Sequence, residues 1–374
     1  MNIEVAKQII KKGNYDNDLQ KIAEKIFNKE RITFEDGILL YEKAGLSFLS
    51  SIANFVRESK NYDFTYYNRN FHIEPTNICI YKCRFCSYSA KDKASSWELN
   101  ADDIIAKVNA YKDIPVTEVH MVGGVHPDRD LHYYGEIIKS IKAIRPDIHV
   151  KAFTAVELDF MIKKAGYSVE EGLAKLKEYG LDSIPGGGAE IFNENIRTQI
   201  CHQKSNSNVW LKIHEAAHKL GIPSNATMLY GHIETYSDRV DHLLKLRDLQ
   251  DKTGMFNAFI PLKFKNKNNE FSEIKETSLI EDLKNYAICR ILLDNFAHIK
   301  AYWPMIGKET AQLSLSFGVD DLDGTIDDST KIYSLAGAED QTPSMNTDDI
   351  KKLIIDAKRI PIERDSIYNV VPEN

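Results

Sequence analysis

Three cysteines lie close together in the sequence and can do metal chemistry. Cys79, Cys83 and Cys86 have the spacing C-x₃-C-x₂-C, and Phe85 stands directly before the last thiol. Three thiolates on one loop can bind three irons of a four-iron cluster, whereas full ligation takes four cysteines. Because no fourth cysteine lies nearby, one iron would stay open to a ligand from outside the protein, as in reactive metal sites. The spacing therefore predicts an iron–sulfur cluster with an open position.

Zinc is the competing interpretation of the cysteine run. Structural zinc sites usually contain two separated Cys or His pairs, and the chain has no second pair. His72 would complete a Cys₃His site, although it lies in a predicted strand whose alternation leaves its direction open. A non-catalytic zinc-binding protein is therefore the alternative from a different functional class. Cys201 and Cys289 stand alone, and a lone cysteine is usually a small buried hydrophobe.

The composition of the chain limits the class of protein. Its 374 residues suffice for one large or two ordinary domains. No apolar run of about 18 residues is present, which argues against a membrane span, and the first residues lack the order of a signal peptide. Five cysteines, an odd number, do not suggest a disulfide framework. The net charge of −7, without a long Lys/Arg run, argues against nucleic acid as a partner. We therefore expect a cytoplasmic protein.

Short apolar or β-branched runs recur along the chain and predict strands. They lie at 70–76, 117–123, 148–154, 182–186, 224–229, 256–262, 299–305 and 317–322. The segments between them have helical periodicity, as in 210–220 and 239–249. Strands that alternate with helices imply right-handed βαβ units and a parallel sheet. Eight such repeats in roughly 250 residues match a closed (β/α)₈ barrel of the TIM type, so we expect an α/β fold.

The two ends of the chain differ from this pattern. Residues 1–68 have helical patterns without clear strands and predict a helical N-terminal extension. We place the barrel core at 69–325 and a C-terminal segment, packed on the barrel, at 326–374. In that segment, 347–359 predicts a helix with Asn346 or Thr347 as its N-cap, because acidic residues occupy the first turn.

Unusual residues follow the predicted strands repeatedly. In parallel barrels the chemistry gathers in the loops at the C-terminal ends of the strands. The residues found there are the three cysteines after the first strand, Gly123–Gly124 after the second, Glu157 after the third, Gly186–Gly188 and Glu190 after the fourth, Gly231–Glu234 after the fifth, and Asp320, Asp321 and Asp323 after the eighth. This coincidence predicts one active site at that end of the barrel.

The cysteine run also resembles the signature of a known family. C-x₃-C-x-aromatic-C after a first barrel strand is similar to the motif of the radical S-adenosylmethionine (SAM) enzymes. The resemblance implies a [4Fe–4S] cluster on the three cysteines, with the open iron chelated by the amino and carboxylate groups of SAM. It further implies reductive cleavage of SAM to methionine and a 5′-deoxyadenosyl radical, and an electron donor such as a flavodoxin or ferredoxin.

Other positions match the cofactor motifs of that family. Gly123–Gly124 resembles the strand-two glycine motif, whose backbone binds the methionine amino group, although Val125 replaces the usual trailing acid. The remaining positions that the resemblance assigns to the cofactor are Phe85 beside the last thiol, Glu157 for the ribose hydroxyls, and Thr227, Leu229 and Gly231 in a string similar to the adenine-supporting G-x-I-x-G-x-x-E. Thr227 replaces the first glycine of that string, and a solvated acid at the start of a helix is the other interpretation of Glu157.

Longer strings narrow the resemblance to the menaquinone (futalosine-pathway) branch. They lie at 183–192, 225–235 and 294–303. The strings at 317–325 and 361–365 resemble members that attach the radical to 3-[(1-carboxyvinyl)oxy]benzoate and form 6-amino-6-deoxyfutalosine. In such a transferase SAM is a co-substrate. The nearest alternative is the branch that cyclises dehypoxanthinylfutalosine, whose members tend to have an Asn-Asp-Phe-Gly-Ser-Thr-Met string that this chain lacks.

That reaction requires a site for two substrate carboxylates. Arg197 is a candidate because its planar guanidinium binds a carboxylate with two hydrogen bonds, although most arginines lie on the surface. His232 and His126 lie in the predicted active-face loops, where they would either donate hydrogen bonds to a carboxylate or stabilise the loop. Gly186–Gly188 would let backbone amides approach an anion, or form a tight turn. The three aspartates after the eighth predicted strand would bind ribose hydroxyls or pair with a base.

Overall fold

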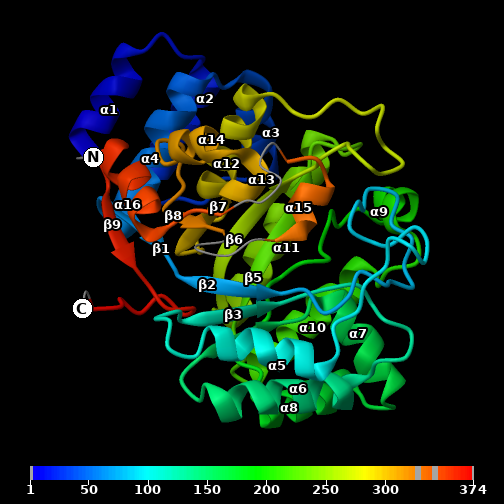
Figure 1. Cartoon of the computed structure of the whole chain (residues 1–374). Coiled ribbons are helices and arrows are strands. Elements are labelled where there is room, and N and C mark those ends of the chain that lie inside the picture. Colours follow the sequence, from blue (N-terminus) through cyan, green and yellow to red (C-terminus); the bar gives the residue numbers. More distant parts are fainter. Residues whose placement is uncertain (1–2, 325–329, 339–343, 373–374) are drawn as a thin grey trace.

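Parallel strands form the centre of the protein, and helices pack outside them (Figure 1). The structure is a computed structural model and describes residues 3–324, 330–338 and 344–372. The strands at the predicted positions are β2 (Asn70–Ile73), β3 (Glu118–Met121), β4 (His149–Ala152), β5 (Ser224–Tyr230), β6 (Phe256–Lys263), β7 (His298–Tyr302) and β8 (Asp321–Asp323). Each strand lies within three residues of its predicted range at the start, except β8, which begins four residues later than expected.

The strands form a ring through two sheets. One sheet has the order β2-β3-β4 and the other β5-β6-β7-β8-β1-β9, and all the pairings between named strands are parallel. Parallel bridges from Lys151 to Ser183 and from Ile184 to Ser224 join β4 to β5 through the predicted fourth strand. On the other side β1 (Phe64–Tyr67) pairs with β8, while β2 pairs with β3. Segment 64–73 is thus one bent strand that closes the ring, and the expected (β/α)₈ class is confirmed.

Arg69 connects the two sheets at this bend. Its carbonyl oxygen accepts a hydrogen bond from the Thr117 N–H group, 3.0 Å away, just before β3. Its guanidinium lies 2.7 Å from Glu363 on β9 (Ile360–Glu363), a strand that pairs with β1. Arg69 therefore contacts both sheets at the point where the ring closes.

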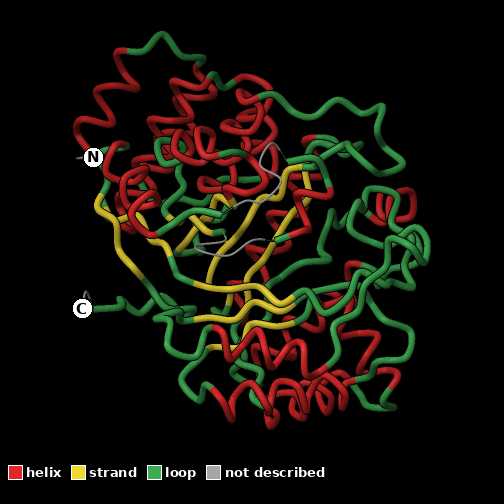
Figure 2. Tube along the Cα trace, in the orientation of Figure 1, coloured by secondary structure: helices red, strands yellow, loops and turns green. Residues whose placement is uncertain are grey.

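The helices begin at polar capping residues and cover the outside of the ring. They are α5 (Ala101–Ala110), α6 (Leu131–Ile144), α7 (Ala155–Lys164), α8 (Val169–Tyr179), α9 (Glu194–Cys201), α10 (Ser207–Lys219), α11 (Tyr236–Thr253), α12 (Leu279–Leu292), α13 (Trp303–Ile306), α14 (Lys308–Ser314), α15 (Lys331–Leu335) and α16 (Thr347–Asp356). The drawing in secondary-structure colours shows this outer layer of helix around the strands (Figure 2). In the described part of the chain no helix is long and apolar enough to cross a membrane.

Polar side chains on β2, β3 and β4 face the inside of the ring. Phe71, Val119 and Val150 are buried and pack in the apolar core, and the Phe71 ring stacks on Tyr111, which follows α5. Because side chains alternate along a strand, the neighbours of these residues point inward. The inward positions hold His72, His120 and Lys151, whereas most barrel interiors of this type contain branched apolar residues. The interior of this barrel is therefore unusually polar on one side.

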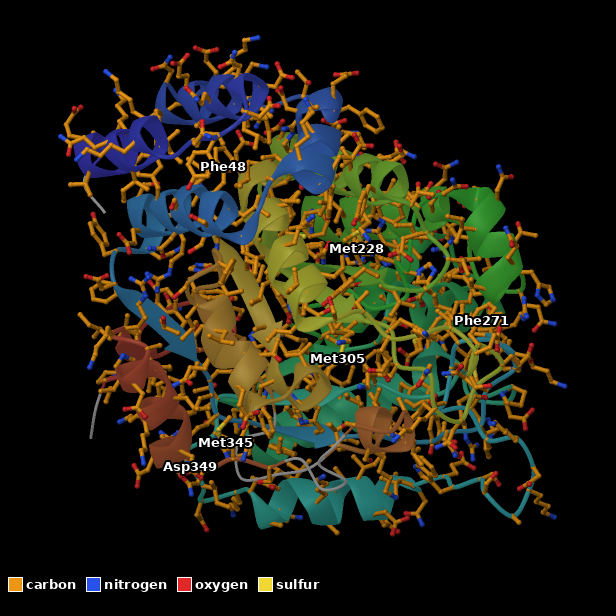
Figure 3. The ribbon with its side chains drawn as sticks, turned by 90° about the horizontal axis from the view of Figure 1, so that it is seen from above. Phe48, Met228, Phe271, Met305, Met345 and Asp349 are labelled. Atoms are coloured by element: carbon orange, nitrogen blue, oxygen red, sulfur yellow. The ribbon has the colours of Figure 1, made fainter. Side chains whose placement is uncertain are left out.

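The N-terminal helices pack against the barrel helices. These are α1 (Ile3–Lys12), α2 (Asn17–Phe27), α3 (Phe34–Lys43) and α4 (Leu46–Asn61). Seen from above, Phe48 of α4 lies among these helices and Met228 of β5 lies near the middle of the molecule (Figure 3). Arg57 is buried in α4 and donates to the carbonyl oxygens of Tyr62 and Val319. The helical extension therefore ends at α4, because residues 64–67, which we had expected to be part of it, form a strand of the ring.

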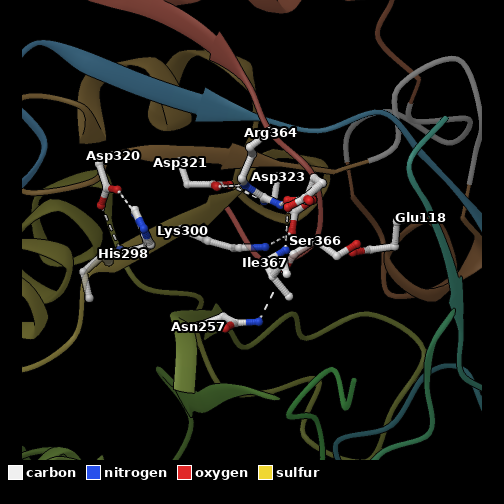
Figure 4. Close-up of polar contacts among 12 residues, drawn as sticks. Glu118, Asn257, His298, Lys300, Asp320, Asp321, Asp323, Arg364, Ser366 and Ile367 are labelled. Carbon is white, nitrogen blue, oxygen red and sulfur yellow. Dashed lines mark hydrogen bonds and ion pairs between the residues drawn. The ribbon is translucent and has the colours of Figure 1, made fainter. Parts of the chain in front are cut away.

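The C-terminal segment begins as predicted and then adds an unexpected strand. Asn346 caps α16 by accepting a hydrogen bond from the Asp349 N–H group at 2.8 Å. The chain continues into β9, which no pattern had indicated, and residues 364–368 then pass beneath the strands. There Arg364 donates from Nε and Nη2, which form one edge of its guanidinium, to the two carboxylate oxygens of Asp321 (Figure 4). The tail thus closes the N-terminal end of the barrel.

The three aspartates of the eighth repeat are placed differently from the prediction. Asp321 and Asp323 lie on β8 and Asp320 directly before it, so none of the three lies in the loop after the strand. Asp320 forms an ion pair with Arg290 and Asp321 with Arg364. Asp323 forms an ion pair with Lys300. Asp320 also binds His298 at 2.6 Å. The expectation that they pair with a base holds. Asp320 and Asp321 lie at the start of the strand, away from the active face. Asp323 at its end lines a cavity inside the ring, and its contact with ribose hydroxyls stays a prediction.

Candidate active site

The cysteine loop follows β2 and is anchored by backbone hydrogen bonds. The Ile80 N–H donates to the Val125 carbonyl at 3.0 Å, and the Arg84 N–H donates to Ile200 at 2.9 Å. Cys79, Cys83 and Cys86 are half-buried free thiols. Burial raises the pKa of Cys79 and raises that of Cys83 to about 12, so these thiols stay protonated until a metal binds them. The loop is held at the active end of the barrel with its sulfur atoms on one segment.

Gly123 and Gly124 lie against the backbone of this loop. A Cβ atom at Gly123 would lie 2.8 Å from the Thr76 carbonyl oxygen, and one at Gly124 would come closer still to the carbonyl of Ile78. The Gly124 N–H donates to Thr76 at 2.7 Å. Only glycine allows this approach, so the pair seats the start of the cysteine loop on the end of β3.

Replacing Gly124 with alanine should therefore displace the cysteine loop and reduce cluster loading. The added methyl group collides with backbone rather than with a flexible side chain, so the loop has to move. We expect the iron and acid-labile sulfide per chain of the anaerobically reconstituted G124A protein to fall well below the wild-type values. Gly45→Ala is the control, because a Cβ there meets open space. Equal loading of G124A and wild type would contradict the steric argument.

Glu157 links this glycine pair to the next helix. Its Oε1 accepts a hydrogen bond from the Gly123 N–H at 3.0 Å, and its Oε2 accepts from the Thr154 N–H and hydroxyl at 2.7 and 2.8 Å. Burial raises the pKa of Glu157 to about 7. The acid at the start of α7 is thus buried rather than solvated. The carboxylate caps α7 and fixes the loop after β3, and its contact with ribose stays a prediction.

A half-buried cation that had not been predicted lies beside the cysteine loop. The Lys204 Nζ lies 2.6 Å from Glu190 Oε1 and 5.2 Å from the centre of the Phe85 ring. Cys83, once it is deprotonated, and the Glu190 carboxylate raise the pKa of Lys204 above its usual value, against the desolvation that lowers it. Lys204 follows α9, well away from any motif, and only the fold brings it to the loop. It places positive charge next to ligands that are anionic when they bind metal.

The three residues proposed to bind substrate carboxylates have partners within the protein. The guanidinium of Arg197 is buried and donates to the carbonyl oxygens of Ala189, Ile191 and Ser205. The His232 side chain is buried, with Nε2 3.1 Å from the Leu229 carbonyl oxygen. His126 accepts a hydrogen bond from the Asp128 N–H at 3.1 Å. Each side chain stabilises its own loop in this structure, and a role of any of them in carboxylate binding stays a prediction.

The predicted adenine-supporting string lies on β5 and packs on the loop after the fourth strand. The Thr227 hydroxyl donates to the Gly186 carbonyl oxygen at 2.8 Å, and the Leu229 N–H donates to the backbone carbonyl oxygen of Glu190 at 2.8 Å. Gly186 and Gly231 have φ values of +88° and +90°, which favour glycine. These glycines therefore serve the turns in which they lie, and they bring the fourth and fifth strand ends together.

A cavity of about 160 Å³ lies inside the ring. Its lining comes from the strands and their ends: His72, His120, Val122, Lys151, Thr154, Pro185, Gly187, Asn225, Thr227, Ile260, Leu262, Tyr302, Asp323 and Ile332. Of these, Gly187, Thr227 and Asp323 belonged to the predicted site, and His72 had been considered as a zinc ligand. The polar residues at inward strand positions were the missed signal, since polar residues alternate with core residues on β2, β3 and β4. His72 points into this cavity, on the strand rather than in the cysteine loop.

Comparisons with known proteins decide the family. The family model "Radical SAM superfamily" matches residues 73–246, and "CofH/MqnC C-terminal region" matches residues 253–374. The chain is 42% identical to the aminodeoxyfutalosine synthase of Thermus thermophilus, over 96% of this chain and 98% of that protein. The chain belongs to the radical SAM superfamily. As a radical SAM enzyme it uses a [4Fe–4S] cluster together with SAM, and the interpretation as a zinc-binding protein is set aside.

Other known proteins match nearly as much of the chain. Cyclic dehypoxanthine futalosine synthase of Streptomyces coelicolor is 38% identical over 94% of this chain and 88% of its own length. A 5-amino-6-(D-ribitylamino)uracil–L-tyrosine 4-hydroxyphenyl transferase of Methanocaldococcus jannaschii is 36% identical over 95% and 99%. Among solved structures, methylornithine synthase has a TM-score of 0.72 at 15% identity, covering 91% of this chain and 97% of its own. That likeness supports the barrel fold alone.

The donor set at the cysteine loop fits the cluster that this family uses. Three thiols lie on one short loop, and the closely packed Gly123–Gly124 backbone adjoins it. Across the residues that the structure describes, no group of three or more His, Cys, Asp or Glu side chains is arranged to hold a metal ion. The match to the cluster therefore rests on the ligand chemistry, three thiolates that leave one iron open. It does not rest on side chains already arranged around a metal position.

Proposed function

We propose that this radical SAM enzyme joins the 5′-deoxyadenosyl group of SAM to 3-[(1-carboxyvinyl)oxy]benzoate, with rearrangement and loss of one carboxylate as CO₂, to form 6-amino-6-deoxyfutalosine. The observation that best supports this proposal is the 42% identity to an aminodeoxyfutalosine synthase over nearly the full length of both proteins. A second such enzyme, from Streptomyces coelicolor, is 36% identical over 95% of this chain. The strings at 317–325 and 361–365 favour the same branch.

The parts of the chain divide the work of this reaction. When bound, the cluster and SAM supply the 5′-deoxyadenosyl radical at the C-terminal end of the barrel. Cys79, Cys83 and Cys86 would hold the cluster, and the Gly123–Gly124 backbone would adjoin the methionine part of SAM. The barrel cavity would hold the alkene roughly 3–3.5 Å from the radical carbon. Its apolar walls, Ile260 and Leu262 among them, exclude water from a site where a radical has to survive.

A second candidate is supported by one observation. The chain is 38% identical to a cyclic dehypoxanthine futalosine synthase, which is close to its identity with the proposed relatives. Such an enzyme would abstract a hydrogen atom from dehypoxanthinylfutalosine instead of adding the radical to an alkene. The two activities differ in the fate of SAM, since 5′-deoxyadenosine is released only by hydrogen abstraction.

Product analysis separates these reactions. Anaerobically reconstituted protein is incubated with SAM, dithionite and each substrate in turn, and the products are identified by mass spectrometry. With the benzoate we expect 6-amino-6-deoxyfutalosine as the product. With dehypoxanthinylfutalosine we expect neither consumption of that substrate nor release of 5′-deoxyadenosine. The reverse pattern would overturn the proposal. Replacement of dithionite by a reduced flavodoxin or ferredoxin then tests the proposed class of physiological electron donor.

A further inference from the structure

One wall of the barrel cavity is a row of three nitrogen-bearing side chains. His72 on β2 is the register partner of His120 on β3, which is the register partner of Lys151 on β4. All three side chains line the cavity, and the two imidazole rings lie 5.1 Å apart. β6 lies across the ring, where Ile260 and Leu262 form an apolar wall. The cavity therefore has a polar side and an apolar side, which suits a flat ligand with one charged substituent.

Lys151 supplies ammonium N–H donors to this row, and its charge is balanced by the Glu118 carboxylate, which does not line the cavity. Lys151 is 2% exposed, and its Nζ lies 2.5 Å from Glu118 Oε2, which is also buried. In the described part of the chain Glu118 is the one hydrogen-bond acceptor of this ammonium group. Because an ammonium group has three N–H donors, two remain for the cavity. Unsatisfied donors on a buried charge are costly, so this group favours an anionic ligand.

Apart from Glu118, which balances the Lys151 charge from outside the cavity, the neighbours of Lys151 add no unpaired negative charge to this row. Burial lowers the pKa of His120 to about 3, so its imidazole is neutral near pH 7 and retains one N–H donor. The buried Nε2 atom of His120 has no partner among the described residues. Asp323 is the carboxylate that lines the cavity, and Lys300 neutralises it at 2.6 Å.

We propose that Lys151, with His120 beside it, binds the ring carboxylate of the substrate. The assignment of this carboxylate rests on the proposed function. The alkene has to meet the radical near the cysteine loop, beyond the end of β2, whereas Lys151 lies within β4 and deeper in the barrel. The carboxylate on the acrylate end stays with the alkene, so the ring carboxylate reaches the Lys151 row. The aromatic ring then lies against Ile260 and Leu262.

Two ligands and one double variant test this assignment. Dissociation constants are measured anaerobically, with cluster-loaded protein and SAM but without reductant, for the benzoate and for 2-phenoxyprop-2-enoate, which lacks the ring carboxylate. Wild type should bind the benzoate about 10- to 150-fold more tightly, the range of a hydrogen bond to a charged group. Lys151→Met combined with Glu118→Gln removes the ammonium without leaving a buried unpaired carboxylate. This protein should bind the two ligands about equally and keep its iron content and SAM affinity.

A matched variant controls for the loss of a buried ion pair. Lys263 and Asp282 form another such pair, 2.7 Å apart, whose residues do not line this cavity. The Lys263→Met, Asp282→Asn protein should retain the preference for the benzoate. If the Lys151→Met, Glu118→Gln protein still prefers the benzoate as strongly as wild type does, Lys151 does not bind the ring carboxylate. If wild type forms no adduct from the benzoate, the proposed function fails instead.

A second measurement needs only the wild-type protein. In 3-[(1-carboxyvinyl)oxy]benzaldehyde an aldehyde replaces the ring carboxylate, and its condensation with a lysine amine releases water and forms an imine. Cyanoborohydride reduces the imine to a stable secondary amine, which peptide mass spectrometry locates. The modification should fall on Lys151 and be prevented by excess benzoate. Modification of Lys300 or Lys204 instead, or of no lysine, would overturn the assignment even if the double variant does not fold.

Discussion

Replacing Cys83 with alanine should abolish radical chemistry while leaving the barrel folded. The loop has three thiols for a cluster that already lacks a fourth protein ligand, so two thiols cannot hold it with one open iron. Anaerobic reconstitution should give little acid-labile sulfide and little of the visible absorption of a [4Fe–4S] cluster. Formation of 5′-deoxyadenosyl products from SAM should fall below detection. Far-ultraviolet circular dichroism should match wild type, because Cys83 lies on a half-buried loop outside the strands.

Cys201 provides the matched control for this experiment. It is buried at the end of α9, adjacent in sequence to Ile200, whose carbonyl accepts the Arg84 N–H. It therefore lies close to the cysteine loop without belonging to it. Cys201→Ala should retain the cluster and the activity. A Cys83→Ala protein with a full complement of iron and sulfide, or a Cys201→Ala protein without it, would show that the ligand set has been assigned wrongly.

Replacing Arg364 with methionine should cause the largest loss of stability in the C-terminal tail. The guanidinium of Arg364 and the carboxylate of Asp321 are both fully buried and form two hydrogen bonds, at 2.5 and 3.1 Å. The Asp321 charge raises the pKa of Arg364 well above its usual value despite burial. Removal of Arg364 leaves a buried carboxylate without a counter-ion, which typically costs about 3–5 kcal/mol. Urea unfolding, followed by circular dichroism, measures the loss of free energy.

Two further variants show whether the unpaired charge is the cause. Arg364→Met combined with Asp321→Leu removes both charges, and it should recover most of the lost stability, since apolar replacement of a buried pair is often neutral. Arg31→Met removes ion pairs to Asp251 and Asp294 that are about 40% exposed, and should cost at most about 1 kcal/mol. A loss of less than about 1 kcal/mol in Arg364→Met would mean that the tail pair contributes little.

The barrel and its active end could be predicted from local patterns. Alternation of short apolar runs with helical segments indicated the strands, and the cysteine spacing indicated the metal chemistry. Gly123–Gly124 was identified by its resemblance to a cofactor motif, whereas its contact with the cysteine loop depends on pairing between β2 and β3. These features were accessible because each depends on residues within one strand and the loop that follows it.

The polar interior and the C-terminal tail required long-range information. Lys151 and His120 lie on strands whose alternation is visible, but the direction of the barrel axis is not, so either face could have been the inner one. The partner of Asp321 is Arg364, 43 positions later in the chain, and no local pattern connects them. For the same reason β9 was missed, since its four residues become a strand only by pairing with β1. Arg197 looked available in the sequence because its carbonyl partners become close only in the folded loop.

The bent strand at 64–73 makes the barrel a ring with a seam. β1 belongs to one sheet and β2 to the other, and Arg69 spans the joint between them. The cysteine loop leaves directly from the β2 side of this seam. A cofactor bound there therefore rests on the joint that closes the ring, and its binding energy adds to the stability of the folded state as well as to catalysis. Cofactor binding and closure of the seam are in this way thermodynamically linked, so each favours the other.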